Sequence, residues 1–91
     1  MVYTIEVAPS ADRDLDKLKD RIRKQDFERL RDAVSSLAEE PRPQGVRKIK
    51  SAERAYRIRV GNYRVVYEVY DSDKLVLILQ VVRRSETTYR Q

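Results

Sequence analysis

The amino-acid sequence predicts an α+β fold, in which one small, largely antiparallel sheet carries two helices on one face. Two observations predict this class. The part of the chain before Pro41 holds two stretches whose apolar residues recur at helical spacing, whereas the part after Pro43 alternates apolar and polar residues. The chain has 91 residues, so a single domain over residues 1–91 is expected, with the element order β-α-α-β-β-β-β.

The first expected elements are a short strand and a helix. Val2–Val7 alternates apolar with polar side chains, which is typical of a strand. Ala8-Pro9-Ser10 then forms a helix start, because proline is favoured at the first helical position. The first helix is expected to run to about Lys19.

A second helix is expected before the prolines. Its apolar residues step by three, four and three positions, with charged residues between them: Phe27, Leu30, Val34 and Leu37. We expect this helix to end at Glu39 or Glu40, because the prolines that follow cannot continue it. The two helices should form a hairpin that turns within Asp20–Lys24.

The rest of the chain predicts four strands. They are expected around Val46 and Ile49, over Tyr56–Val60, over Tyr63–Val69 and over Lys74–Val82. Gly61-Asn62 is a two-residue hairpin turn of the kind that begins with glycine. The last stretch, KLVLILQVV, is almost continuously apolar and is expected to be the central strand of the sheet.

The first hairpin brings arginines together. A two-residue loop at Gly61-Asn62 pairs Arg59 with Arg64, and directly paired residues share a face of the sheet. Arg57, Arg59 and Arg64 are therefore expected on one face, with the apolar residues of both strands on the other. Like charges opposite each other destabilise a sheet, so this face is interpreted as one that holds a polyanion. The alternative is that the arginines cover an exposed face with their aliphatic stems.

The second hairpin allows two registers. A three-residue loop over Asp71–Asp73 pairs Tyr70 with Lys74 and Arg64 with Gln80, and adds Gln80, Val82 and Arg84 to the arginine face. A two-residue loop instead delivers Val81 and Arg83, since a slip of one residue swaps every side chain across the sheet. The first register is favoured because it groups four arginines on one face.

Charge and composition restrict the class of protein. Residues 1–41 contain 8 basic and 10 acidic residues, and residues 42–91 contain 12 basic and 5 acidic ones. A basic half suggests an anionic partner: nucleic acid, an acidic protein segment, or both. The sequence has no cysteine and no histidine, which excludes a thiolate zinc site and removes the commonest general base. Without a long apolar run or a signal peptide, a cytoplasmic protein that does not contact a membrane is expected.

Two sets of residues are interpreted as structural. The tyrosines expected to pack in the core or at an interface are Tyr56, Tyr63 and Tyr67. Asp12, Asp14 and Asp16 step by two, so on a helix their side chains diverge. They are expected to form a solvated helix face rather than a metal site.

The sequence resembles the RelE group of the RelE/ParE toxin superfamily, small basic partners of toxin–antitoxin pairs, over essentially the whole chain. The resemblance is carried by the opening YTIEVAPSADRDLDKL, a helical hairpin ending in proline, the block KIK…AYRIRVGNYRVVYEV and the segment RRSETTY. It implies a RelE-like fold, a small sheet flanked by helices. It also implies the toxin of a type II toxin–antitoxin system that acts as a ribosome-dependent endoribonuclease and cuts messenger RNA in the decoding site.

The implied partners are a cognate antitoxin, the ribosome and its messenger RNA, and operator DNA only through the antitoxin complex. No cofactor and no metal are implied, because such cleavage proceeds by attack of the RNA's own 2′-hydroxyl. Two alternatives stay open. One is a ParE-like toxin that poisons a topoisomerase through protein contacts, and the other is a nucleic-acid-binding module without enzymatic activity.

The resemblance also implies roles for individual residues. Arg64 and Arg84 would hold the scissile phosphate, Tyr89 would stack on a base, and Arg57 and Arg59 would complete the catalytic set. Family members carry lysine among the last two positions, and arginine cannot replace lysine as a proton acceptor. Lys48 and Lys50 or ribosomal RNA are therefore the candidate bases. The residues expected to contact RNA outside the catalytic set are Lys48, Lys50, Arg83 and Arg90.

Overall fold

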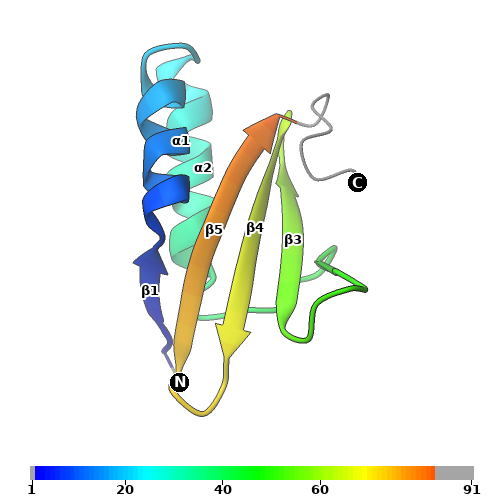
Figure 1. Cartoon of the computed structure of the whole chain (residues 1–91). Coiled ribbons are helices and arrows are strands. Elements are labelled where there is room, and N and C mark those ends of the chain that lie inside the picture. The colour runs from blue at the N-terminus through cyan, green and yellow to red at the C-terminus, as the bar shows by residue number, and fades with distance from the viewer. Residues whose placement is uncertain (1, 84–91) are drawn as a thin grey trace.

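The computed structural model describes residues 2–83, and its elements follow the predicted order, which confirms the α+β class (Figure 1). The elements are β1 (Thr4–Val7), α1 (Pro9–Lys19), α2 (Lys24–Ser36), β2 (Arg47–Lys48), β3 (Ala55–Val60), β4 (Tyr63–Tyr70) and β5 (Leu75–Arg83). Arg84, Tyr89 and Arg90 lie outside the described residues. None of the helices in residues 2–83 is long and apolar enough to cross a membrane.

The helices begin as predicted, but the second one ends earlier. Proline occupies the first turn of α1, where its missing N–H would have no helical partner. The prediction that α2 ends at Glu39 or Glu40 is wrong, because regular α-helix stops at Ser36. The next three residues form a tight turn with bonds to carbonyls three positions back, for example from Leu37 N–H to the Val34 oxygen at 3.1 Å.

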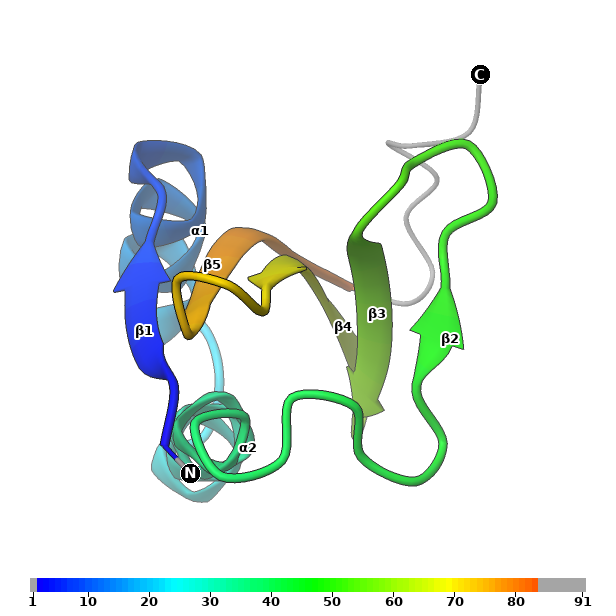
Figure 2. The ribbon, with the colours of Figure 1, turned by 90° about the horizontal axis from the view of Figure 1, so that it is seen from below.

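The five strands form one sheet in the order β1-β5-β4-β3-β2. The β1–β5 pair is parallel and the other pairs are antiparallel. The expectation that the last strand is central is therefore wrong, because β4 is the middle strand and β5 lies between β1 and β4. Figure 2 shows this strand sequence from below, with β2 at the edge opposite to β1.

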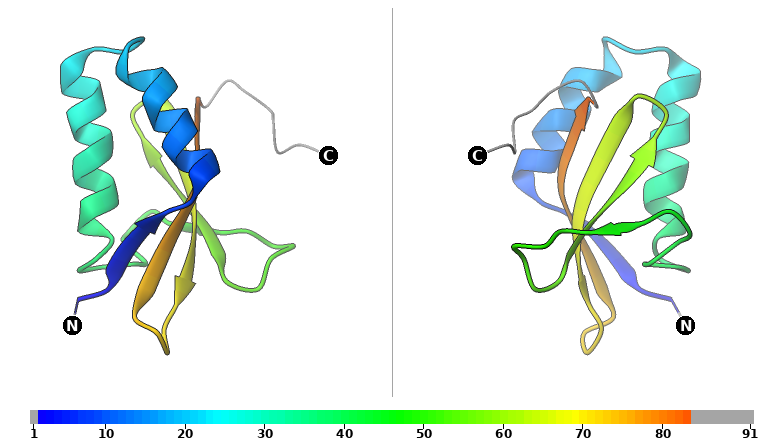
Figure 3. Two further views of the ribbon diagram at one scale, coloured as in Figure 1. Left: turned by 60° about the vertical axis from the view of Figure 1, so that its left-hand side comes forward. Right: turned by 90° about the vertical axis from the view of Figure 1, so that its right-hand side faces the viewer.

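The core lies between the helices and one face of the sheet. Both helices stand on the same side of the sheet, as the left view of Figure 3 shows. Ala11, Leu30 and Leu37 reach the sheet, where they meet apolar residues of β3, β4 and β5. Tyr67 is fully buried in this cluster, and its hydroxyl donates a hydrogen bond of 2.7 Å to the Pro41 carbonyl. Tyr56 stacks on Tyr67 with ring centroids 6.0 Å apart, and Tyr63 is buried as well, which confirms the packing role predicted for the three tyrosines.

The β3–β4 hairpin has the predicted register. Gly61 adopts a φ of +59°, a conformation that glycine reaches without a steric cost, at the first position of the two-residue turn. Arg59 pairs with Arg64, and Val60 pairs with Tyr63. The turn therefore sets the arginines of both strands on one face and the core residues on the other.

The β4–β5 hairpin differs from both predicted registers. Its loop has four residues, so that Tyr70 pairs with Leu75 rather than with Lys74. A β-bulge further along leaves Leu79 without a direct partner, and Arg64 therefore pairs with Val82 rather than with Gln80. The longer loop and the bulge each shift the pairing by one residue. Because side chains alternate between the two faces, a total shift of two residues returns Gln80 and Val82 to the predicted face.

The face assignment is thus confirmed, although the pairing was wrong. Gln80 and Val82 lie on the same face as Arg64, as the favoured register predicted. Val81, which the alternative register placed beside the arginines, is 3% exposed and belongs to the core.

A polar cluster ties the β4–β5 loop to two distant parts of the chain. Asp71 accepts a hydrogen bond of 2.6 Å from the Tyr3 hydroxyl and forms an ion pair of 2.8 Å with Arg42. The Arg42 Nε also donates to the Tyr56 hydroxyl at 3.1 Å. The hydrogen bond from Arg42, which is the larger cause, and the one from Tyr3 hold the pKa of the Asp71 carboxyl below its usual value. The cluster joins the start of the chain, the segment after α2 and the loop.

We expect Asp71→Asn to lower the free energy of unfolding at neutral pH and to have a smaller effect at about pH 3, where part of the contribution of the carboxylate is lost. Because the pKa of Asp71 is lower in the folded chain than in the unfolded chain, the ionised carboxylate stabilises the fold above about pH 3.9. This contribution is lost as the pH falls through the folded-state pKa. Urea unfolding of both proteins at the two pH values measures the effect, and an equal difference at both would contradict its electrostatic origin.

Candidate functional site

The sheet face opposite to the core carries a cluster of four arginines, here called the arginine face: Arg47, Arg57, Arg59 and Arg64. Arg47 of β2 lies directly opposite Arg57 of β3, and Arg59 lies directly opposite Arg64 of β4. The two pairs are two residues apart along β3, which is roughly 6.7 Å, and neighbouring strands lie about 4.8 Å apart. Four arginine side chains therefore start from a small area of one face.

Within residues 2–83, Arg57 and Arg59 of this face form no ion pair with a carboxylate. The ion pairs within residues 2–83 are Arg42–Asp71 at 2.8 Å and Arg54–Glu53 at 3.5 Å. Arg57 and Arg59 take part in neither of them. Guanidinium forks match phosphate oxygens in shape and bind them with two parallel hydrogen bonds. The arrangement is thus suited to binding a polyanion and to stabilising negative charge on it.

The arginines of the face differ in exposure. Arg57 and Arg64 are partly buried, whereas Arg47 and Arg59 are exposed. The Nε atom of Arg64 is shielded from solvent. Arg64 of β4 pairs with Arg59 on the β3 side and with Val82 on the β5 side, and Val82 is 8% exposed. A less hydrated guanidinium interacts more strongly with an anion than one in bulk water.

Arg47 was not singled out by the sequence analysis. The expected strand around Val46 and Ile49 was correct in position, but it is only two residues long and six residues separate it from β3. No tight turn fixes its register, so the pairing of Arg47 with Arg57 could not be derived. In the sequence, only the alternation of apolar Val46 with Arg47 indicated that Arg47 faces away from the core.

Lys48 lies on the opposite face from the arginines. It pairs with Tyr56, and its ammonium donates to the Ala52 oxygen at 2.9 Å and to the Glu53 oxygen at 2.7 Å. It also lies 5.4 Å from the centre of the Tyr56 ring. The structure therefore separates Lys48 from the arginine face, contrary to its expected role there. Lys50 is exposed in the turn after β2.

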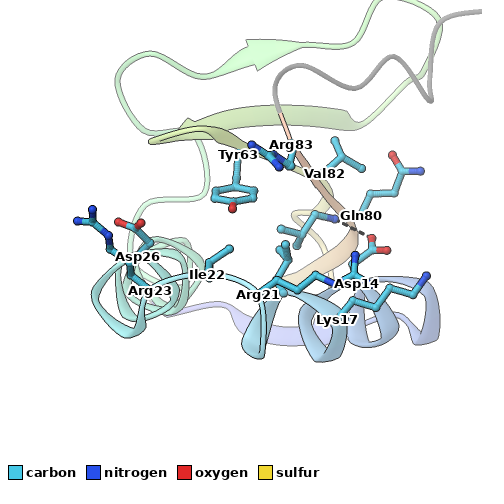
Figure 4. A pocket seen from close by; sticks show the side chains of 12 residues that line it. Asp14, Lys17, Arg21, Ile22, Arg23, Asp26, Tyr63, Gln80, Val82 and Arg83 are labelled. Carbon is cyan, nitrogen blue, oxygen red and sulfur yellow. Dashed lines mark hydrogen bonds between the residues drawn. The ribbon is translucent and has the colours of Figure 1, made fainter.

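Arg83 also points away from the arginine face, because it pairs with Tyr63, a core-face residue. Arg83 lines a groove of about 640 Å³, here called the end groove, which lies between α1, the turn to α2 and the end of β5 (Figure 4). The basic side chains of this end groove are Lys17, Arg21, Arg23 and Arg83, and its acidic ones are Asp14 and Asp26. The three C-terminal site residues predicted from the sequence, Arg84, Tyr89 and Arg90, lie outside the described residues.

Asp14 has a role that the sequence analysis missed. Its carboxylate accepts a hydrogen bond of 3.0 Å from the Val81 backbone N–H (Figure 4). Ser10, one turn earlier on α1, donates 2.8 Å to the Leu79 carbonyl. β1 pairs with β5 only as far as Ile78, so these two side chains satisfy the edge of β5 beyond β1. The prediction of a solvated face is therefore wrong for Asp14, whereas Asp12 and Asp16 are exposed.

Nearly the full length of the chain is similar to known toxins. The family described as ParE toxin of the type II toxin–antitoxin system parDE matches residues 5–88. A protein of Methanocaldococcus jannaschii assigned as the toxin RelE1 is 24% identical over 87 residues, which cover 92% of each chain.

Solved structures share the fold. A chain of the archaeal RelE–RelB complex from Pyrococcus horikoshii is 27% identical, with a TM-score of 0.78 and coverage of 96% of this chain and 100% of that chain. A chain of the toxin–antitoxin complex RelBE2 from Mycobacterium tuberculosis is 23% identical, with a TM-score of 0.74 and coverage of 94% and 95%. The second similarity concerns the fold alone.

We expect Asp14→Ala to lower the free energy of unfolding by about 1–3 kcal/mol, because it leaves the Val81 N–H at a partly buried edge without its partner. The matched control is Asp16→Ala, which removes the same charge from an exposed position of α1. It should change stability by less than about 0.5 kcal/mol. Urea unfolding compares the three proteins. Equal stabilities of the two variants would show that the hydrogen bond between Asp14 and Val81 contributes nothing.

Proposed function

The chain belongs to the ParE toxin family of type II toxin–antitoxin systems, and we propose that it is a RelE-like endoribonuclease that cuts messenger RNA on the ribosome. Membership in this family confirms the resemblance noted in the sequence, and the fold is that of RelE toxins. What we propose beyond the family is the activity itself, the cleavage of messenger RNA on the ribosome.

One observation carries the proposal. The β3–β4 register sets Arg57, Arg59 and Arg64 together on the face that the helices leave open. Such a cluster is costly for folding, since like charges oppose each other across the strands. A face that binds a phosphodiester offsets this cost when the anion is present. The charge of the chain agrees, because residues 42–91 contain 12 basic and only 5 acidic residues.

The proposed reaction is an internal attack within the messenger RNA. The 2′-oxygen forms a bond to the adjacent phosphorus, and the bond from phosphorus to the 5′-oxygen breaks, leaving a 2′,3′-cyclic phosphate and a 5′-hydroxyl. A base takes the 2′-proton, and the leaving oxygen gains one. Arg64 and Arg84 hold the phosphate and stabilise the additional negative charge that develops on it. Tyr89 stacks on a base and aligns the attacking and leaving oxygens.

The chain itself offers few groups that could act as the general base. A guanidinium group has no lone pair suited to accept a proton, so Arg57 and Arg59 are assigned to binding and orientation rather than to the role of base. Lys48 is held at the opposite face by two carbonyl oxygens. The base is therefore Lys50 or a group of the ribosomal RNA. This division suits a substrate that the ribosome has already aligned.

The proposal includes the partners and the compartment. A cognate antitoxin neutralises the protein, as expected from relatives solved in toxin–antitoxin complexes. Operator DNA is bound only through that complex. Since the substrate is a translated message, the protein acts in the cytoplasm.

The name of the matching family favours a second candidate function, that of a ParE-like protein that poisons a topoisomerase. Members with that activity generally lack the set of arginines and the tyrosine found here as Arg64, Arg84 and Tyr89. The set therefore supports the nuclease over the topoisomerase poison.

Expression of the toxin followed by sequencing of RNA ends and ribosome positions separates the candidates. The nuclease predicts new 5′ ends inside codons of translated messages within minutes of induction. A topoisomerase poison would leave messages intact and induce DNA damage signals. Intact messages without DNA damage would indicate a binding module and would contradict the proposal.

We expect Arg64→Ala and Arg84→Ala each to lower the rate of cleavage on programmed ribosomes by about 10²–10³-fold, because each removes a fixed donor to the phosphate. Arg13→Ala, an exposed position on α1, is the control and should cleave like the parent protein. Circular dichroism checks that each variant is folded. Full cleavage by both folded site variants would refute the assignment of these residues.

A further inference from the structure

The β-bulge in β5 places two neighbouring side chains on the sheet face opposite to the core, here called the open face. Ile78 and Val81 both belong to the core, with exposed fractions of 0% and 3%. Because side chains alternate along a strand, the residue after Ile78 and the residue before Val81 both point away from the core. These residues are Leu79 and Gln80. Gln80 also borders the end groove, but its amide points away from the helices that form this groove (Figure 4).

Gln80 lies next to the arginines of the open face. It is directly opposite Val66 of β4, and Val82, two residues further along β5, is directly opposite Arg64. Two residues of a strand span roughly 6.7 Å, so the Gln80 side chain starts at about this distance from the level of Arg64. The separation is comparable with that between the phosphate and the base of one nucleotide. A nucleotide whose phosphate is bound by Arg64 can therefore bring its base to Gln80.

The charges along the open face favour a base over a second phosphate beside Gln80. The side chains that β4 presents on this face change from basic Arg64 through apolar Val66 to acidic Glu68. The Glu68 carboxylate accepts a hydrogen bond of 2.6 Å from the Tyr70 hydroxyl. A phosphate moved from Arg64 toward Glu68 would be repelled by this carboxylate, whereas a neutral base would not. The gradient thus orients a bound nucleotide, with its phosphate at the arginines and its base toward Gln80.

The surroundings of Gln80 suit a flat ring with a polar edge. Val66 and Leu79 are half-buried, so each exposes part of an apolar side chain against which a ring can pack. The Gln80 amide carries hydrogen-bond donors and an acceptor side by side, and it has no hydrogen-bond partner among residues 2–83. Proteins recognise the bases of single-stranded RNA in this way, by packing against the ring and forming hydrogen bonds with its edge.

We propose that Gln80 recognises the base next to the scissile phosphate and favours adenine. The amide accepts a hydrogen bond from the N6 amino group of adenine and donates one to N7. On the same edge guanine presents two acceptors, and cytosine and uracil present one group each, so only adenine matches both groups of the amide. That the base belongs to a message rests on the proposed function, whereas the preference rests on the open face. Gln80 is then a specificity-determining residue.

The test measures binding of the full chain to three short labelled RNAs whose 2′-hydroxyls are methylated, so that they cannot be cut. The first contains only adenine. The second contains 7-deazaadenine, which lacks the N7 acceptor, and the third contains purine, which lacks the N6 amino group. Fluorescence anisotropy gives the dissociation constants. The parent protein should bind the adenine RNA about fivefold more tightly than either analogue, because each analogue loses one hydrogen bond to the amide.

A pair of variants assigns the preference to Gln80. Gln80→Leu keeps a side chain of similar size but removes the amide, so it should bind the three RNAs equally. The matched control is Gln25→Leu, the same change at an exposed position of α2, and it should keep the fivefold preference. A purely structural effect of Gln80→Leu would weaken all three RNAs by the same factor and leave the ratio of dissociation constants unchanged. On ribosomes, adenine should be enriched next to the cuts of the parent protein, and Gln80→Leu should lose this enrichment.

Several outcomes would overturn the proposal. Equal binding of the three RNAs by the parent protein would show that the adenine edge is not recognised. A preference that survives Gln80→Leu, or that Gln25→Leu removes as well, would place its origin elsewhere in the chain. The binding measurements need no ribosome. A parent protein that prefers the adenine RNA but cuts no message would therefore contradict the proposed function and leave the role of Gln80 in base recognition intact.

Discussion

The structure depends on the register of the β3–β4 hairpin, which a two-residue turn fixes. Gly61 takes a positive φ that other residues reach only with strain, and the turn matches the twist of the two strands. With this register, every second residue of both strands points to the helices. The remaining positions then face the open side, and these are the positions that carry Arg57, Arg59 and Arg64. One turn thus separates the core from the site.

The energetic terms on the two faces are unequal, which explains how the chain tolerates its arginines. Opposed like charges cost about 0.2–1 kcal/mol per pair. Full burial of a large apolar side chain contributes about 1.5–3 kcal/mol, and Val65, Tyr67, Val76 and Ile78 are all completely buried on the core face. The core therefore outweighs the repulsion by a wide margin. The helical half adds little repulsion, since residues 1–41 carry slightly more acidic than basic side chains.

The two sides of the sheet are closed in different ways. Beyond β1, the edge of β5 is closed by Ser10 and Asp14 of α1, so the helix acts in place of a strand. The edge of β3 beyond β2 has no such cover from side chains of residues 2–83 and lies beside arginines. An open edge is normally a risk for aggregation, and charged side chains reduce that risk. In this chain Arg57 and Arg59 lie at that edge, so they reduce this risk.

The sequence alone determined the features that depend on neighbours along the chain. The tight turn at Gly61-Asn62 gave the pairing of Arg59 with Arg64, and the helical spacing gave the core-facing residues of α1 and α2. The family was likewise evident from motifs spread over the whole chain.

Only the tertiary structure decided features that depend on the packing of distant segments. The four-residue loop and the bulge at Leu79 together shifted the pairing by two residues, so the face of Gln80 was predicted correctly through a wrong register. The positions of Arg47 and Lys48 on opposite faces, and the contact of Asp14 with β5, also came from the structure. The reason is physical: a two-residue turn fixes its own hydrogen bonds, whereas longer connections leave the register to whichever pairing packs best against the core.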